Sequence, residues 1–536
     1  MATLTPRLRD AALRWAADDP DPTTRTELQR VLAAALVGAE AAVADLVDRM
    51  SGPLTFGTAG LRGPVRAGPA GMNVAVVRRA SAGLAAWLRD RGEVGIVVVG
   101  RDARHGSAAF ATATAEVLAG AGFAVRILPA PAPTPLLAFA VRELGAVAGV
   151  QITASHNPAT DNGYKVYLAD GAQLVPPDDI EIEGRIAAAP AAVSIPTAGA
   201  GLRVDVTEPY LDRVARLPRG TARGLRIALT PMHGVGGATA VHALARAGFT
   251  DVQVVASQAA PDPDFPTVAF PNPEEPGATD ALLALAAARG AHLAVALDPD
   301  ADRCALGVPL PDGTWRMLTG DETGVLLGDH LLRSGGYADP LVVTTVVSSS
   351  MLGAIAAAYG ARYTETLTGF KWIVRGGPGL VYGYEEALGY CVDPDAVRDK
   401  DGIAAAVLAA DLAATLRAEG RTLLDRLDEL AIAHGVHRTE GLAFRLEPAA
   451  RDAVLDRLRG APPAGWTTDR PAPDVLVLRR HGERVVVRPS GTEPKLKVYL
   501  QVVEPVPGPA ALAGARTRAA DRLAALRTCY THLVSA

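Results

Sequence analysis

Apolar runs typical of buried strands recur three times along the first two-thirds of the chain. Each run leads into a small polar loop and an alanine-rich helix, and each helix ends at a glycine that precedes a second strand. The first strands are GIVVVG (95–100), LRIALT (225–230) and LVVTTVV (341–347), and the segments with the second strands are AGAGFAVRIL (119–128), ARAGFTDVQVV (245–255) and AAYGARYTETL (357–367). A spacing of about 120 residues predicts three related α/β domains rather than a solenoid, whose repeats are far shorter.

The last hundred residues have a different pattern. VLVLRR, ERVVVRPS and KLKVYLQVV alternate between apolar and polar positions, as an antiparallel sheet does, and 510–534 is predicted as a closing helix. An Ala/Pro/Gly-rich linker at 186–202 and a boundary near Asp312 divide the rest. The predicted fold is therefore α/β, with three related mixed α/β domains and a C-terminal α+β domain. The predicted domains are 1–204, 205–312, 313–436 and 437–536.

One uncharged run, 340–361, is long enough to cross a bilayer. Its centre holds Ser348, Ser349 and Ser350, which hydrocarbon would not accommodate. A buried strand, a polar turn and an alanine-rich helix explain the run better, so we predict no membrane span.

Composition narrows the classes of function. The 536 residues suffice for three or four domains of about 150 residues. With 53 basic and 58 acidic residues, the net charge of −5 argues against nucleic acid or an anionic membrane as the main partner. Cys304, Cys391 and Cys529 match no zinc spacing and exclude a disulfide framework, which predicts a reducing, cytoplasmic location. The charged N-terminus is predicted to be neither a signal peptide nor an anchor.

Lysine is scarce, since only five of the 53 basic residues are lysines. A compact ammonium can lose its proton or fill a narrow site in ways that a guanidinium cannot, so the few lysines are candidates for chemistry. All five lie in or beside polar, glycine-containing segments: Lys165, Lys371, Lys400, Lys495 and Lys497.

The first candidate loop, TASHNP (153–158), follows an apolar run. Ser155 stands beside His156 and ten residues before Lys165, an arrangement that suits a nucleophile with acid or base assistance. The alternative is an ordinary polar turn, signalled by Asn157 before proline.

The second loop, DPDADR (298–303), also follows a strand-like run. Asp298, Asp300 and Asp302 occupy alternate positions, so on an extended loop they point to one side, and three hard oxygen ligands suit Mg²⁺. Arg303 can hold a phosphate. The alternative is a solvated acidic turn.

The third and fourth loops lie in the second half of the chain. In GYEEALG (383–389), Glu385 and Glu386 can accept hydrogen bonds from neighbouring sugar hydroxyls, and Lys371 lies just upstream; the alternative is a solvated helix start. In RPSGTEPKLK (488–497), hydroxyls and cations flank a glycine and can cradle a phosphate; the alternative is a tight hairpin. The cradle residues are Arg488, Ser490, Gly491, Thr492 and Lys497.

Together with GTAGLRG (57–63), these loops resemble the α-D-phosphohexomutase superfamily in content and order, over nearly the whole chain. The resemblance implies three α/β domains and a TATA-binding-protein-like fourth domain around one central cleft, in a monomer or homodimer. It implies a phosphosugar substrate, Mg²⁺ as cofactor and a sugar 1,6-bisphosphate as activator.

By position, the resemblance implies that Ser155 is phosphorylated and that Asp298, Asp300 and Asp302 join it in holding Mg²⁺. The phosphoryl group would pass to a sugar monophosphate, and the resulting bisphosphate would return its other phosphate to Ser155. The resemblance also implies proton transfer for His156 and Lys165, stabilisation of charge for Arg62 and Arg303, and a phosphoglucomutase-type lysine in Lys371. The residues that it implies to anchor the non-reacting phosphate are Arg488, Ser490, Gly491, Thr492 and Lys497. A lysine in such a cationic site is expected to have a lowered pKa.

One position departs from the family pattern. Many hexose mutases have a serine where this chain has Ala387, two positions after the first glutamate of the third loop. The third loop is more similar to the branch with phosphoglucomutase-2, phosphopentomutase and glucose-1,6-bisphosphate synthase. The leading hypothesis is a Mg²⁺-dependent mutase of glucose or mannose phosphates. The alternatives are a pentose-phosphate mutase, a bisphosphate synthase, a serine-dependent phosphatase and a non-catalytic sugar-phosphate sensor.

Overall fold

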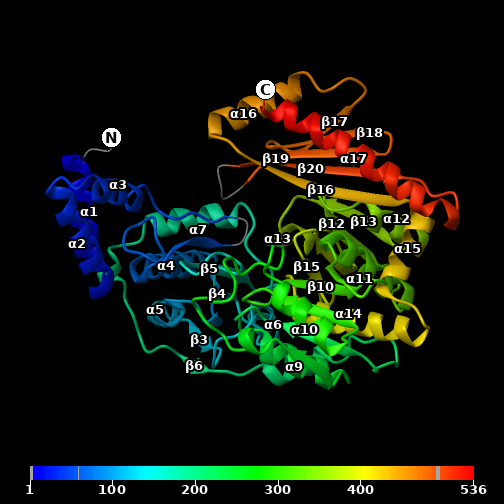
Figure 1. The fold of residues 1–536 in the computed structure, drawn as a ribbon. Helices are drawn as coiled ribbons and strands as arrows, with labels where there is room; N and C mark the ends of the chain where they lie inside the picture. Colours follow the sequence, from blue (N-terminus) through cyan, green and yellow to red (C-terminus); the bar gives the residue numbers. More distant parts are fainter. Residues whose placement is uncertain (1–3, 58–59, 491–494, 536) are drawn as a thin grey trace. The chain divides into compact units, whose positions relative to one another are not determined.

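The computed structural model describes residues 4–57, 60–490 and 495–535 (Figure 1). The described chain divides into two compact units. The first comprises residues up to 217 together with 226–304 and 395–407. The second comprises 218–225, 305–394 and the chain from 408 onward.

Three helices precede the first sheet: α1 (Pro6–Asp18), α2 (Pro22–Leu36) and α3 (Glu40–Arg49). Thr5 caps α1 by accepting a hydrogen bond from the backbone of Leu8, and Pro6 begins the helix without losing a needed donor. The three helices share a hydrophobic cluster of their own, centred on the fully buried Leu28 and Leu46.

The first sheet has six strands in the order β1-β5-β4-β2-β3-β6. The pairs β2/β3, β2/β4 and β3/β6 are parallel, whereas β4/β5 and β1/β5 are antiparallel. The strands are β1 (Leu61–Pro64), β2 (Ile96–Arg101), β3 (Ala124–Ile127), β4 (Ala148–Ile152), β5 (Asp161–Leu168) and β6 (Leu202–Arg203). The accompanying helices are α4 (Val74–Asp90), α5 (Ser107–Gly120), α6 (Thr134–Glu143) and α7 (Asp178–Ala187).

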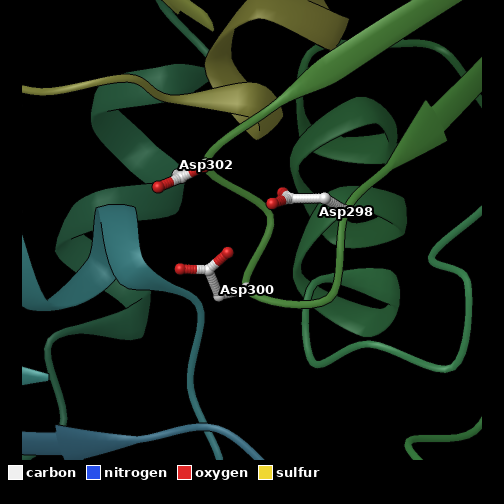
Figure 2. A group of neighbouring side chains, drawn as sticks. All are labelled: Asp298, Asp300 and Asp302. Atoms are coloured by element: carbon white, nitrogen blue, oxygen red, sulfur yellow. The ribbon is translucent and has the colours of Figure 1, made fainter. Parts of the chain in front are cut away.

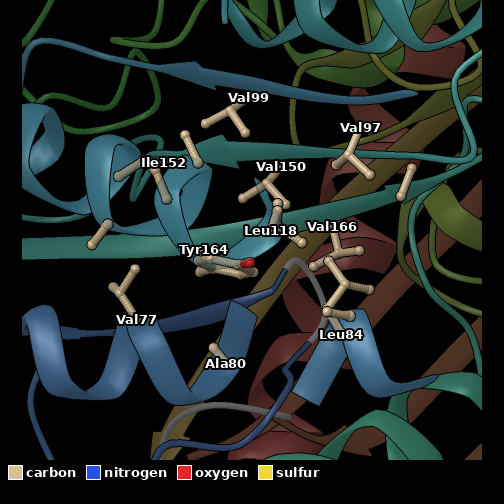
Figure 3. Packing of buried hydrophobic residues seen from close by; sticks show 14 of the residues in the cluster. Val77, Ala80, Leu84, Val97, Val99, Leu118, Val150, Ile152, Tyr164 and Val166 are labelled. Atoms are coloured by element: carbon tan, nitrogen blue, oxygen red, sulfur yellow. The ribbon is translucent and has the colours of Figure 1, made fainter. Parts of the chain in front are cut away.

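The core of this sheet explains how β5 presents its side chains. Val77 and Leu84 on α4 pack with Tyr164 and Val166 of β5 in one hydrophobic cluster (Figure 3). Because successive residues of a strand point to opposite faces, Lys165 projects away from this cluster. The packing of β5 therefore places a buried lysine on the face opposite to α4.

The second sheet has the order β11-β10-β9-β7-β8 and the third has the order β13-β12-β14-β15. The strands of the second are β7 (Arg226–Thr230), β8 (Asp251–Val254), β9 (Leu293–Leu297), β10 (Cys304–Pro309) and β11 (Trp315–Met317), with helices α8 (Thr207–Val214), α9 (Gly237–Arg246) and α10 (Asp280–Arg289). The strands of the third are β12 (Leu341–Thr345), β13 (Arg362–Thr366), β14 (Leu380–Glu385) and β15 (Gly389–Cys391), with helices α11 (Gly320–Ser334), α12 (Met351–Ala358), α13 (Phe370–Ile373), α14 (Gly402–Ala418) and α15 (Leu423–His434).

The predicted repeat is confirmed. In each of the three sheets a strand, a helix and a parallel neighbouring strand follow one another, as β2/β3, β7/β8 and β12/β13. The glycines that end the connecting helices have left-handed backbones: Gly122 has φ +95°, Gly248 +96° and Gly360 +68°. The run 340–361 forms β12, a turn and α12, as predicted. Within the described ranges, no helix has both the length and the apolar character needed to cross a bilayer.

The fourth sheet is antiparallel and has the order β16-β20-β19-β18-β17. One face packs against α17, where Leu523 and Leu526 join a cluster with Val485 and Leu500. The other face contributes Val477 and Val486 to a second cluster with residues after β12. The elements are β16 (Val436–Arg445), α16 (Pro448–Gly460), β17 (Thr467–Ala472), β18 (Val475–Arg480), β19 (Glu483–Pro489), β20 (Lys495–Glu504) and α17 (Leu512–Ser535); short 3₁₀ turns lie at Ala192–Ser194, Ala256–Gln258 and Pro509–Ala511.

Candidate active site

Ser155 lies in the loop between β4 and β5, with a side chain that is almost fully buried. Its Oγ donates a hydrogen bond to Asp298 Oδ2 at 2.8 Å and lies 3.2 Å from His156 Nδ1. Its φ of +54° is in the left-handed region that residues with a Cβ rarely adopt. The serine of the first loop and an aspartate of the second therefore meet in the first unit.

The three aspartates stand on the single turn between β9 and β10 (Figure 2). All three are completely buried, and oxygens from the three carboxylates lie within 4.8 Å of one another. Ala301, in the middle of the turn, has φ +56°. No other cluster of metal-ligating side chains is found among the residues that the structure describes.

The donor set of this turn fits Mg²⁺. Asp300 Oδ1 and Asp302 Oδ1 are buried and have no hydrogen-bond partner within the described chain. Burial and the neighbouring carboxylates of Asp300 and Asp302 raise the pKa of Asp298 well above its usual range. Unpartnered, hard oxygen atoms and a carboxylate destabilised by like charges are features that a divalent cation resolves.

Lys165 contributes an ammonium to the same turn. Its Nζ lies 2.6 Å from Asp300 Oδ2 and 2.9 Å from Asp302 Oδ2. Thr134 Oγ1 also donates to Asp300 Oδ2, at 2.5 Å. Asp300 and Asp302 thus each use Oδ2 for contacts within the protein, and Oδ1 of each has no hydrogen-bond partner within the described residues.

The expectation of a lowered pKa for Lys165 is wrong for this structure. Burial disfavours the ammonium, but the carboxylates of Asp300 and Asp302 outweigh burial and raise the pKa of Lys165. The lowered pKa was expected from neighbouring cations, whereas the nearest charges to Lys165 are the two carboxylates that it contacts directly.

The other predicted residues of this unit lie around the same turn. Arg62 on β1 donates to Asn157 Oδ1 at 3.0 Å and interacts electrostatically with Asp300. Arg303 donates its backbone N–H to Asp298 Oδ1 at 3.0 Å. Burial, followed by the positive charges of Arg303 and Arg62, lowers the pKa of His156 well below its ordinary value. These surroundings therefore favour the neutral form of the imidazole beside Ser155.

Lys400 belongs to this site, although sequence reasoning assigned it no role. It lies in the 395–407 segment of the first unit, with Nζ 3.3 Å from Asp302 Oδ2. A Cβ on Gly402 would stand 2.3 Å from the carbonyl oxygen of Arg303, so only glycine permits this approach. The rarity of lysine was the one sequence signal that pointed to Lys400.

The second unit holds the third loop, between β14 and β15. Glu386 Oε2 accepts hydrogen bonds from Ser348 Oγ at 2.9 Å and from Thr345 Oγ1 at 3.2 Å. Leu388 has φ +62°. A Cβ on Gly320 would lie 1.8 Å from the carbonyl oxygen of Glu386, which shows how closely α11 approaches the loop. Glu385 is half-buried at the end of β14, and Lys371 lies on α13.

Burial, reinforced by the charges of Glu385 and Asp321, raises the pKa of Glu386 from 4.5 to about 7. Between these values the folded protein keeps a proton that the unfolded chain releases, so the free energy of unfolding falls as pH rises, by up to about 3 kcal/mol. Glu386→Gln should therefore melt like the wild type near pH 5 and at a higher temperature at pH 8. Thermal melts at both pH values test this, with the exposed Glu447→Gln as control; an equal difference at both pH values would contradict it.

Of the phosphate-cradle residues that are described, Arg488 lies on β19, Ser490 directly follows β19 and Lys497 lies on β20. Arg488 and Lys497 are directly opposite one another in the register of β19 and β20, and Ser490 donates its N–H to the carbonyl of Lys495. This register brings two cationic side chains to one place in the sheet. Tyr499, on β20, hydrogen-bonds with Arg488, and burial together with the charge of Glu386 raises the pKa of its hydroxyl. Gly491 and Thr492 lie outside the described residues.

The first unit thus brings together the following predicted site residues: Ser155, His156, Lys165, Arg62, Arg303 and the three aspartates. Comparison with models of protein families also divides the chain into four successive domains. Four models described as phosphoglucomutase/phosphomannomutase domains match in order: α/β/α domain I at residues 53–192, domain II at 208–310, domain III at 319–432 and the C-terminal domain at 469–506.

Individual relatives agree with these models. A protein of Haemophilus influenzae named "Probable phosphomannomutase" is 41% identical, over 80% of this chain and 93% of its own. A protein of Schizosaccharomyces pombe named "Probable phosphoribomutase" is 34% identical, over 93% of this chain and 94% of its own. The crystal structure of a phosphoglucomutase/phosphomannomutase family protein from Burkholderia thailandensis covers 87% of this chain and 96% of its own with a TM-score of 0.69; at 20% identity it supports the fold.

Proposed function

Because the chain belongs to the phosphoglucomutase/phosphomannomutase family and is thus a phosphosugar mutase, we propose that it interconverts the 1-phosphate and 6-phosphate of glucose, mannose or both. The observation that carries the proposal is the contact between Ser155 Oγ and Asp298, 2.8 Å apart at a buried cluster of three aspartates. A hydroxyl held at a cation-binding turn is suited to carrying a phosphoryl group.

In the proposed reaction, phosphorylated Ser155 gives its phosphoryl group to the free hydroxyl of the sugar phosphate. The bond between phosphorus and Oγ breaks, a bond to the sugar oxygen forms, and the hydroxyl proton leaves. His156, with Nδ1 3.2 Å from Oγ, and Lys165 are proposed to exchange that proton. Because Asp300 and Asp302 raise the pKa of Lys165, its ammonium is proposed as a proton donor only. The bisphosphate then returns its other phosphoryl group to Ser155 by the reverse chemistry, so no water is consumed.

The proposal assigns Asp298, Asp300, Asp302 and phosphorylated Ser155 to holding Mg²⁺, which when bound offsets charge on the migrating phosphoryl group. Arg62 and Arg303 offset the remaining charge. A sugar 1,6-bisphosphate is the proposed activator, since it can phosphorylate an unmodified Ser155.

The loops of the second unit are assigned to recognition. Glu385 and Glu386 are proposed to accept the sugar hydroxyls, and Lys371 to assist at the same loop. The residues proposed to anchor the non-reacting phosphate are Arg488, Ser490, Gly491, Thr492 and Lys497. Arg488 and Lys497 support this assignment because their register brings two cations, which suit a phosphate, to one place in the sheet.

A pentose substrate is the second candidate. Ala387 provides no hydroxyl where many hexose mutases have one, and the relative from Schizosaccharomyces pombe is named a phosphoribomutase. A bisphosphate synthase, in which the bisphosphate is released rather than turned over, would use the same residues. We propose that the enzyme is cytoplasmic, which is supported by its three cysteines, none of which forms a disulfide within the described chain.

A competition followed by ³¹P NMR tests these candidates. Glucose 1-phosphate, mannose 1-phosphate and ribose 1-phosphate are mixed with enzyme, Mg²⁺ and a trace of glucose 1,6-bisphosphate. We expect a hexose 6-phosphate to form first. Faster formation of ribose 5-phosphate would identify a pentose mutase, and accumulation of bisphosphate a synthase. Free phosphate as the sole product would indicate a phosphatase, and binding without turnover a sensor.

A further inference from the structure

One buried arginine outside the motifs described above holds the loop that carries Ser155. Arg104 follows β2 and is 4% exposed. Its Nη2 donates to the carbonyl oxygens of Ser155 and Asn157, both at 2.6 Å. Its Nη1 donates to those of Pro158 at 2.6 Å and Asp161 at 3.1 Å. A single guanidinium thus binds four carbonyls of one seven-residue stretch.

The conformation of Ser155 explains why such a clamp is needed. A residue with a Cβ and a φ of +54° is held only where its surroundings fix the backbone. Arg104 fixes the carbonyl side of Ser155, while Thr153 Oγ1 accepts the N–H of Ser155 at 2.9 Å. Both peptide groups of Ser155 are therefore oriented by buried side chains, and this orientation directs Oγ toward Asp298.

Asp102 links the two supports. Its Oδ1 accepts hydrogen bonds from the Arg104 backbone N–H at 2.9 Å and from Ser107 Oγ at 2.5 Å. Its Oδ2 forms an ion pair with Arg104 Nε at 3.3 Å, and its side chain hydrogen-bonds with Thr153. The Phe265 ring lies 4.9 Å from the guanidinium carbon. Together these contacts fix the orientation of the planar Arg104 guanidinium.

We infer that Arg104 is a positioning residue for phosphoryl transfer, which orients the Ser155 peptide so that Oγ faces the aspartate turn. This inference rests on the proposed function of Ser155. A guanidinium presents five donors in a rigid plane, whereas the ammonium of lysine offers three from one point, so lysine cannot bind four separated carbonyls. Because the four carbonyls that Arg104 binds belong to the stretch that carries Ser155, and none belongs to a residue assigned to sugar recognition, Arg104 should affect turnover and leave sugar-phosphate binding unchanged.

Arg104→Lys tests the inference, with Arg426→Lys as control. Arg426 is a mostly buried arginine of the second unit, and its Nε and Nη2 donate to the two carboxylate oxygens of Asp329. We expect Arg104→Lys to fold, to lose about 10²-fold or more in kcat and to change KM by less than about threefold. Arg426→Lys should keep wild-type kcat. A kcat for Arg104→Lys within about twofold of the wild type would overturn the inference.

Two further measurements separate positioning from structural support. Methylguanidinium added to Arg104→Ala should restore part of its kcat, which a general loss of folding would not allow. Thr153→Val, which removes the other support while keeping the shape of a fully buried side chain, should lower kcat about tenfold with KM unchanged. Thr323 is also fully buried but lies in the second unit, and Thr323→Val should change neither kcat nor KM. If Thr153→Val has full activity and Arg104→Ala cannot be rescued, Arg104 is structural only. Absence of isomerisation by the wild-type enzyme would instead remove the proposed function itself.

Discussion

Ser155→Ala should abolish isomerisation, lowering kcat by about 10⁴-fold or more, because the proposed reaction carries the phosphoryl group on this Oγ between the two positions of the sugar. The buried Oγ has two contacts, to Asp298 and to His156. Leaving the buried Asp298 oxygen without its donor costs about 1–3 kcal/mol, so the fold should survive the substitution. Turnover and a thermal melt of the same preparation give both answers.

Ser257→Ala is the matched control, since Ser257 is an exposed serine of the same unit. It should keep activity within about twofold of the wild type. Mass spectrometry after incubation with glucose 1,6-bisphosphate should find a phosphoryl group on the wild type and on Ser257→Ala, and none on Ser155→Ala. Substantial turnover by Ser155→Ala would remove the serine from the mechanism.

The repeated strands of the three α/β domains could be predicted because their signals are local. A parallel strand buried on both faces is a continuous run of Val, Ile and Leu, and the chain leaving a helix needs a left-handed residue. Gly122, Gly248 and Gly360 supply that residue in the three repeats. Each signal depends on neighbouring residues alone, so the sequence contains it in full.

The edge strands of the fourth sheet could not be predicted in this way. β17, TTDRPA, is exposed along most of its length and has no alternation of apolar residues. It is a strand because its backbone pairs with β18 from Thr467 to Ala472. An edge strand that faces water on both sides has no hydrophobic pattern to reveal it.

The candidate site shows the same limit. Ser155 and the three aspartates could be found because the loop that carries each follows a buried strand, and ligands of α/β sheets bind at the carboxyl ends of strands. Lys400 could not be connected to Asp302, because their contact depends on the return of 395–407 to the first unit. Arg104 was not found either, because its partners are backbone carbonyls, which no side-chain pattern records.

Asp300→Asn should raise the Mg²⁺ concentration needed for half-maximal activity by about 10²-fold or more, with a comparable loss of kcat. Oδ2 of Asp300 already accepts from Lys165 and Thr134, and Oδ1 has no partner within the described chain. If the amide keeps its oxygen toward Lys165, its NH₂ group occupies the position of the unpartnered oxygen and cannot bind a cation. If it turns round, two donors face each other across 2.6 Å.

Neither orientation of the amide therefore satisfies both Lys165 and a cation. Residues that only support metal ligands cost 10- to 100-fold when changed, so a direct ligand should cost at least about 10²-fold. Calorimetric titration of the resting protein with Mn²⁺ measures affinity without relying on turnover. Asp264→Asn, an exposed aspartate of the same unit, is the charge-matched control and should bind Mn²⁺ as the wild type does. An unchanged titration of Asp300→Asn would show that the turn between β9 and β10 holds its cation without this oxygen.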